Sequence, residues 1–118
     1  MLGREVNQLL LSTDVWVGAL IRRAEAGGAF AMVLRKGDPR AGAVLVKVLA
    51  RREGTVRLYA SALRGEGETV WMQPLKDASD SDIEAYVERS RGRDPDLWVI
   101  EIEDAEGRHF LTEPVEAH

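Results

Sequence analysis

The sequence has no cysteine and only two histidines, and each shortage argues against a class of site. Without cysteine the chain can form neither a disulfide framework nor a thiolate-bound metal site, and this composition fits a reducing cytoplasm. Because His109 is internal and His118 is terminal, no closely spaced histidine pair is available for zinc. No serine lies in a Gly-x-Ser-x-Gly elbow, and no P-loop ending in Gly-Lys-Ser/Thr is present. We therefore expect no cofactor or metal, and an enzyme is the less favoured reading.

Long hydrophobic runs are missing as well. An apolar stretch such as Ala43–Val46 is far too short to span a bilayer, and the three leucines at residues 9–11 do not make a signal-peptide core. A chain of 118 residues is close to the commonest size of a single domain. We therefore expect a cytoplasmic protein with one folded domain.

Positive and negative charges are distributed unevenly along the chain. Residues 1–65 contain eleven Lys/Arg and five Asp/Glu, which gives +6, whereas residues 66–118 contain five and fifteen, which gives −10. Such asymmetry indicates either an electrostatic partner or charges that pair within the fold. If the two halves stay apart in space, their surfaces could complement each other between copies of the chain or toward a partner.

The spacing of apolar residues predicts helices at residues 14–26 and between residues 82 and 92. Strands are predicted at residues 30–35, 43–49, 55–62, 69–73 and 97–103, with a short return strand at 109–112. Four strands follow one another without a helix, which argues against a doubly wound parallel sheet. We predict an α+β domain: a mainly antiparallel sheet of four to six strands with two helices on one face, in the order helix, four strands, helix, hairpin. This domain would cover residues 13–112, between an N-terminal arm (1–12) and a loose tail (113–118).

Two sets of polar residues have the spacing of helix N-terminal caps. Ser12 and Thr13 precede the first helix, and either could cap it. Ser81 and Glu84 have the spacing of a capping box at the start of the second helix.

The loop of residues 36–42 is the most suggestive candidate site. Its glycines, Gly37 and Gly42, would allow backbone N–H groups to converge on an anion, and basic side chains flank them. The candidate ligand-binding residues are Arg22, Arg23, Arg35, Lys36, Asp38 and Arg40. A nucleic acid or a phosphorylated small molecule would suit this set, and a plain strand connection with solvated charges would explain it too.

Carboxylates gather near the last predicted strand. They are Asp94, Asp96, Glu101, Glu103 and Asp104. With Lys47 they could hold Mg²⁺ for a nuclease or hydrolase, but cross-strand pairing with Arg51, Arg57 or Lys47 explains them more simply. We therefore predict no metal site here.

Aromatic residues are few, and core packing is the simplest role for the three tryptophans. Trp71 and Tyr59 are the best candidates for stacking on bases, and His109 is expected on a hairpin surface. An isoelectric point near 5.2 disfavours a polyanion as the partner unless the basic half forms a separate surface.

Several short strings resemble a known pattern. They are Trp16-Val17, Arg22-Arg23-Ala24-Glu25, Gly28-Ala29-Phe30-Ala31, Gly37-Asp38, Asp94-Pro95-Asp96-Leu97-Trp98 and Gly107-Arg108-His109-Phe110-Leu111. Together they resemble a small bacterial family known only as domain of unknown function 1491, over about residues 13–112. The resemblance implies no activity, cofactor or catalytic residue, so the function has to be argued from physical features.

The sequence thus favours a small non-enzymatic binding or interaction module that associates with itself, or with a protein partner, through charge-complementary surfaces. The alternative is a binder of nucleic acid or of a phosphorylated small molecule that uses the basic residues of the 36–42 region.

Overall fold

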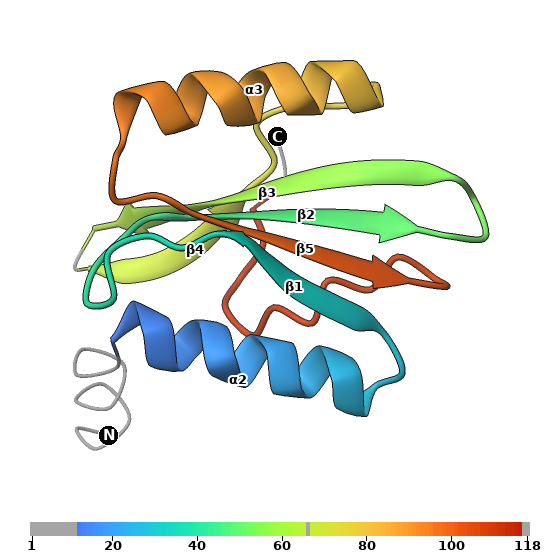
Figure 1. The fold of residues 1–118 in the computed structure, drawn as a ribbon, viewed down its shortest axis with the longest axis horizontal. Helices are drawn as coiled ribbons and strands as arrows, with labels where there is room; N and C mark the ends of the chain where they lie inside the picture. The colour runs from blue at the N-terminus through green and yellow to red at the C-terminus, as the bar shows by residue number, and fades with distance from the viewer. Residues whose placement is uncertain (1–11, 66, 117–118) are drawn as a thin grey trace.

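The computed structural model describes residues 12–65 and 67–116, which form one sheet between two helices (Figure 1). The chain runs in this order: α2 (Thr13–Ala26), β1 (Phe30–Arg35), β2 (Val44–Ala50), β3 (Thr55–Arg64), β4 (Glu68–Met72), α3 (Asp80–Arg93) and β5 (Trp98–Asp104). Most elements therefore lie within one or two residues of their predicted places. All but one residue of the predicted arm lies outside the described residues.

The sheet has the strand order β1-β5-β2-β3-β4. β5 pairs antiparallel with β1 and parallel with β2, while β2, β3 and β4 follow one another antiparallel. The single parallel pair arises because α3 carries the chain back across the sheet before β5. The predicted α+β class and the mainly antiparallel sheet are confirmed.

The two helices cover opposite faces of the sheet, so their predicted placement on one face is wrong (Figure 1). β2 explains why: Val46 and Val48 point to the face of α2, whereas Leu45 packs with Ile83 and Val87 of α3. The centre of the sheet is thus apolar on both faces, and a helix must pack on each face to shield it from water. Leu45, between the valines of β2, is the local sign of this second apolar face.

The predicted return strand at residues 109–112 is absent. β5 lies between β1 and β2, so both of its edges are already paired and no hairpin partner fits there. The chain instead turns at the buried carboxylate of Asp104, which accepts hydrogen bonds from the backbone N–H groups of Glu106 and Arg108. It also accepts two from the Arg108 guanidinium, whose side chain holds the pKa of Asp104 far below its usual value.

Capping of the helices differs from the prediction. Ser79 caps α3, since its hydroxyl accepts from the backbone N–H of Asp82 while the Asp82 carboxylate accepts from the Ser79 N–H. The predicted box at Ser81 lies half a turn too late. At α2, Ser12 is the N-cap residue, and its hydroxyl donates to the Asp14 carboxylate instead of accepting from the helix backbone.

Residues 114–116, which the sequence analysis expected to be loose, run parallel to β4. The Trp71 N–H donates to the Pro114 carbonyl at 2.8 Å, and the Glu116 N–H donates to the Trp71 carbonyl at 2.8 Å. Among the described residues, no helix is both long and apolar enough to cross a membrane.

Candidate functional site

The structure does not bring the six predicted ligand-binding residues together at one point. Arg23 donates from its Nε and Nη2 to the Phe110 carbonyl at 3.1 and 3.0 Å, beyond the end of β5. Arg35 donates from Nη1 to the Leu97 carbonyl at 2.7 Å. Both guanidinium groups therefore bind backbone carbonyls of this chain. Arg22, Lys36 and Arg40 are left, and no described residue accepts a hydrogen bond from their side chains.

The glycines of the 36–42 loop serve a close approach of two backbone segments. A Cβ at Gly37 would lie 2.1 Å from the carbonyl oxygen of Asp96, and one at Gly42 would lie 2.2 Å from the same atom. The loop is fastened there by two hydrogen bonds, from the Asp38 N–H to the Asp96 carbonyl at 3.0 Å and from the Trp98 indole to the Asp38 carbonyl at 2.8 Å. The loop thus packs on the start of β5, and its glycines are needed for that contact.

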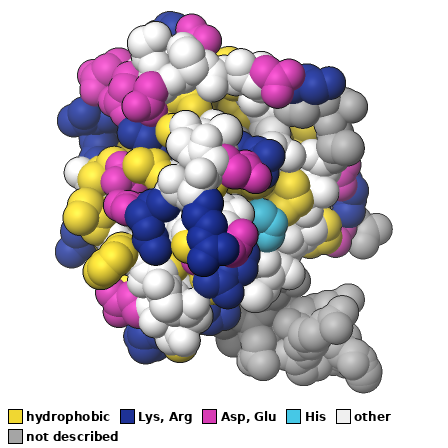
Figure 2. All heavy atoms as spheres, turned by 90° about the vertical axis from the view of Figure 1, so that its right-hand side faces the viewer, with side chains coloured by type: hydrophobic (Ala, Val, Ile, Leu, Met, Phe, Trp, Pro, Cys, Tyr) yellow, Lys and Arg dark blue, Asp and Glu magenta, His cyan; other side chains and the backbone are white. Residues whose placement is uncertain are grey.

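Charges of the two halves of the sequence meet in the fold. Lys47 pairs with Glu84 at 2.7 Å and lies 3.8 Å from Glu101. Further cross-half ion pairs are Arg51–Glu103, Arg52–Glu106, Arg64–Glu68 and Arg64–Glu116. Figure 2 shows basic and acidic side chains next to one another over one face of the molecule. Four of the eleven basic residues of the first half therefore pair with acidic residues of the second half.

The predicted carboxylate cluster is dispersed by this pairing. Glu101 and Glu103 each lie next to a basic side chain of β2 or its turn, and Asp104 is buried against Arg108. Within residues 12–65 and 67–116, no group of three or more acidic or histidine side chains is placed to hold a metal ion.

The aromatic candidates for base stacking belong to the core. Tyr59 and Trp71 are 4% and 1% exposed, on the α2 face of the sheet. His109 is half-buried with its ring edge-on to Tyr59 at 5.2 Å, and burial lowers the pKa of this imidazole. Its Nδ1 accepts a hydrogen bond from the Leu111 N–H, so the side chain holds the irregular segment after β5.

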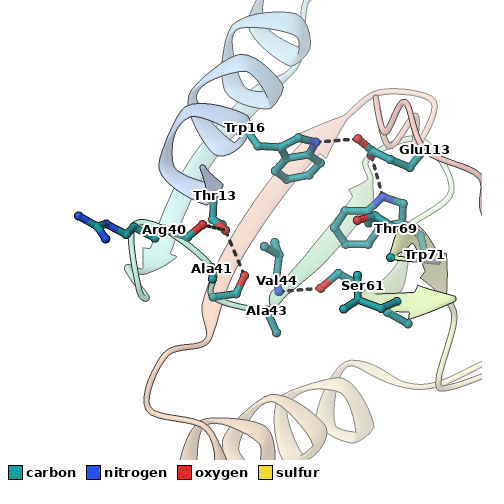
Figure 3. Close-up of a pocket in the computed structure, with 14 residues that line it drawn as sticks. Thr13, Trp16, Arg40, Ala41, Ala43, Val44, Ser61, Thr69, Trp71 and Glu113 are labelled. Atoms are coloured by element: carbon teal, nitrogen blue, oxygen red, sulfur yellow. Dashed lines mark hydrogen bonds between the residues drawn. The ribbon is translucent and has the colours of Figure 1, made fainter. Parts of the chain in front are cut away.

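A cavity of about 440 Å³ lies at the end of the sheet where α2 begins (Figure 3). The first turn of α2, the start of β2 and the ends of β3 and β4 surround it. Its lining residues are mainly apolar or small: Thr13, Trp16, Arg40, Ala41, Gly42, Ala43, Val44, Ser61, Ala62, Leu63, Gly67, Thr69, Trp71 and Glu113. This size and this lining are typical of sites for small ligands.

Two tryptophans and one carboxylate form the wall of this cavity (Figure 3). The rings of Trp16 and Trp71 stack with centroids 5.4 Å apart. Their indole N–H groups donate to the two oxygens of Glu113, at 2.8 Å from Trp16 and 3.0 Å from Trp71. Burial raises the pKa of Glu113, but these hydrogen bonds outweigh it and hold the pKa below its usual value. Glu113 is therefore ionised at neutral pH.

The two edges of the sheet differ in how they are covered. Residues 114–116 cover the β4 edge, whereas no described segment pairs with the outer edge of β1. Phe30, Met32 and Leu34 on β1 are 69%, 55% and 49% exposed. Phe30 and Met32 lie opposite Glu103 and Glu101 on the side of the sheet that α3 covers elsewhere. An apolar edge strand is therefore left open.

Neither the cavity at Glu113 nor the open β1 edge was predicted from the sequence. The five residues 30–34 are apolar and carry no charge, and this lack of protection could have marked β1 as an adhesive edge. Glu113 gave no such signal, because its partners lie 97 and 42 positions earlier in the chain.

Comparison with known proteins places this fold in a family. Residues 11–112 match the family described as "Protein of unknown function (DUF1491)". The crystal structure of a DUF1491 family protein from Caulobacter crescentus CB15 has 67% identity and a TM-score of 0.86, covering 91% of this chain and 100% of that one. An NMR structure of a family protein from that organism gives the same identity and TM-score over 92% and 98% of the two chains.

A more distant solution structure, of protein Atu0922 from A. tumefaciens, has 34% identity and a TM-score of 0.75, covering 92% of this chain and 98% of that one. No match is found among curated proteins. The chain therefore belongs to the DUF1491 family, a family of unknown function.

Proposed function

We propose that this protein is a non-enzymatic interaction module that associates with a second copy of itself through the β1 edge. The observation that carries the proposal is the contrast between the two sheet edges: the chain covers β4 with its own residues 114–116 and leaves the apolar β1 open. Exposed edge strands pair readily with other strands, and proteins usually protect them with charge, proline or a covering segment. A cytoplasmic location is part of the proposal and is supported by the cysteine-free composition.

Geometry supports a second copy as the occupant. Two antiparallel β1 strands related by a two-fold axis would extend the sheet, and a register centred on Met32 would place Met32 beside its own copy. Phe30 of both copies would then lie on the same face. The neighbouring Glu101 and Glu103 would not oppose this approach, since Lys47 and Arg51 partly neutralise them.

Apolar contacts at this edge change the expected response to salt. Charge-complementary surfaces would separate as salt rises, but backbone pairing and apolar burial do not weaken in this way. Because the edge is short, we expect a weak dimer, with a Kd on the order of 10 μM.

Sedimentation velocity at about 50 mM and about 1 M NaCl tests the proposal. We expect a concentration-dependent dimer at both salt concentrations, and a monomer for Met32→Lys. Met72→Lys is the matched control, because Met72 is also exposed but lies on β4, whose edge is covered. A parent chain that stays monomeric, a dimer lost in high salt, or a dimer retained by Met32→Lys would contradict the proposal.

An anion-binding function finds less support. Only Arg22, Lys36 and Arg40 of the predicted basic set have no acceptor among the described residues, and Arg40 is the one that lines the cavity. If salt dissolves the dimer and short RNA binds at low salt, this alternative replaces the β1 proposal.

A further inference from the structure

We propose that the cavity beside Trp16 and Trp71 binds the protonated amine of an apolar molecule or side chain, with Glu113 as its anionic partner. This site is independent of the β1 edge, because the cavity lies near β3 and β4 and β1 is the opposite edge of the sheet. Three features favour such a ligand: the Glu113 carboxylate, the apolar walls, and the lack of a described cation beside that carboxylate.

The Glu113 carboxylate accepts hydrogen bonds from several neutral groups. A carboxylate offers about four lone-pair positions on its two oxygens. The Trp71 indole occupies one on Oε1, while the Trp16 indole and the Thr112 hydroxyl occupy two on Oε2 at 2.8 and 3.2 Å. The backbone N–H of Glu113 itself also interacts with the carboxylate, so every donor that reaches this group is neutral.

Among residues 12–65 and 67–116, the charge of Glu113 also has no cationic partner. All of its donors are neutral groups, and no described lysine, arginine or histidine forms an ion pair with it. An ionised carboxylate at an apolar wall attracts an organic cation strongly, because little water competes for it there. A ligand ammonium would supply the missing charge.

The rest of the cavity fits an apolar body attached to that amine. Val44 and the two tryptophans provide apolar walls, and Leu63, which is 78% exposed, lies at the rim. Ser61 accepts from the Val44 N–H at 2.9 Å and retains its own hydroxyl proton for a ligand acceptor. A volume of about 440 Å³ accommodates a molecule with one aromatic ring.

Calorimetric titration of the full chain with 2-phenylethylamine and with 2-phenylethanol tests the charge requirement. The two probes have nearly the same shape and differ in charge, so we expect the amine to bind at least about 10-fold more tightly. Nα-acetyl-lysine amide is titrated in parallel. If it binds more tightly than 2-phenylethylamine, the natural ligand is a lysine side chain of a protein. If 2-phenylethylamine binds more tightly, the natural ligand is a free amine.

Two variants test the location. Glu113→Gln should abolish the preference for amine over alcohol. Because that change can also weaken the fold, a second test is Thr69→Phe, which narrows the cavity and keeps the Glu113 carboxylate; it should weaken binding at least about 10-fold. Its matched control is Met72→Phe, on the same strand but outside the cavity lining. Equal affinity for amine and alcohol, no binding of either amine up to about 10 mM, or undiminished binding by Thr69→Phe would overturn the proposal.

Discussion

Replacing Gly42 with alanine should severely destabilise the fold, although the change adds one methyl group in a surface loop. The new Cβ would lie 2.2 Å from the Asp96 carbonyl oxygen and 2.8 Å from Cδ1 of Trp98, whereas ordinary contacts are 3.4–4 Å. The backbone of the loop and that of the β5 start must therefore move apart by about 1 Å. Such overpacking typically costs about 1–3 kcal/mol.

The displacement would also strain two hydrogen bonds that fasten the loop, from the Asp38 N–H to Asp96 and from the Trp98 indole to Asp38. Each contributes about 1 kcal/mol, so the total loss in unfolding free energy should be about 3–5 kcal/mol. For a domain of this size, about 4 °C of melting temperature is lost per kcal/mol, which gives about 12–20 °C.

Urea denaturation followed by tryptophan fluorescence measures this loss. Gly37→Ala should behave in the same way, because its Cβ would lie 2.1 Å from the same carbonyl. Gly92→Ala is the control: it lies in α3 with no atom near its added Cβ, so alanine should stabilise the protein by about 0.5–1 kcal/mol. Unfolding free energies of Gly37→Ala and Gly42→Ala that both lie within about 0.5 kcal/mol of the parent value would contradict this packing prediction.

Two further predictions concern the capping box and the buried carboxylate. In urea denaturation, Ser79→Ala should lower the unfolding free energy by about 1 kcal/mol, because the Asp82 N–H loses its acceptor. The control Ser81→Ala should change it by less than about 0.5 kcal/mol. Equal losses for the two variants would refute the assignment of the cap. Asp104→Asn should cost about 2 kcal/mol at pH 7, since the Arg108 side chain loses a charged acceptor. The folded pKa of Asp104 is depressed, so its stabilisation is complete above about pH 4 and is lost as the pH falls through the folded value. In thermal melts at several pH values, the difference between parent and Asp104→Asn should shrink below about pH 4, and a constant difference would contradict this reasoning.

Much of the fold could be predicted because local patterns carry it. The alternation of Val56, Leu58 and Ala60 marked β3, and the apolar spacing of residues 16–24 marked α2. The order of the strands could not be predicted, because inserting β5 between β1 and β2 leaves no local trace. That insertion accounts for the missing return strand.

The candidate sites depended more heavily on contacts between distant residues. Gly37 and Gly42 looked like anion-binding glycines because the sequence does not reveal that Asp96 approaches them. Arg23 and Arg35 looked like free cations because their carbonyl partners, Phe110 and Leu97, carry no charge that a sequence pattern could match. Main-chain acceptors are present at every residue, so composition cannot indicate which of them a guanidinium will bind.

The parallel pairing of β2 with β5 has a consequence for how the protein folds during synthesis. It joins residues 44–50 to residues 98–104, so the middle of the sheet cannot close until residues 98–104 have left the ribosome. Until then, the hairpins of β2, β3 and β4 expose the valine-rich inner strand to other nascent chains. Closing such a distant pair is entropically slow, so the newly made polypeptide passes through an interval in which chaperone binding would protect it from aggregation.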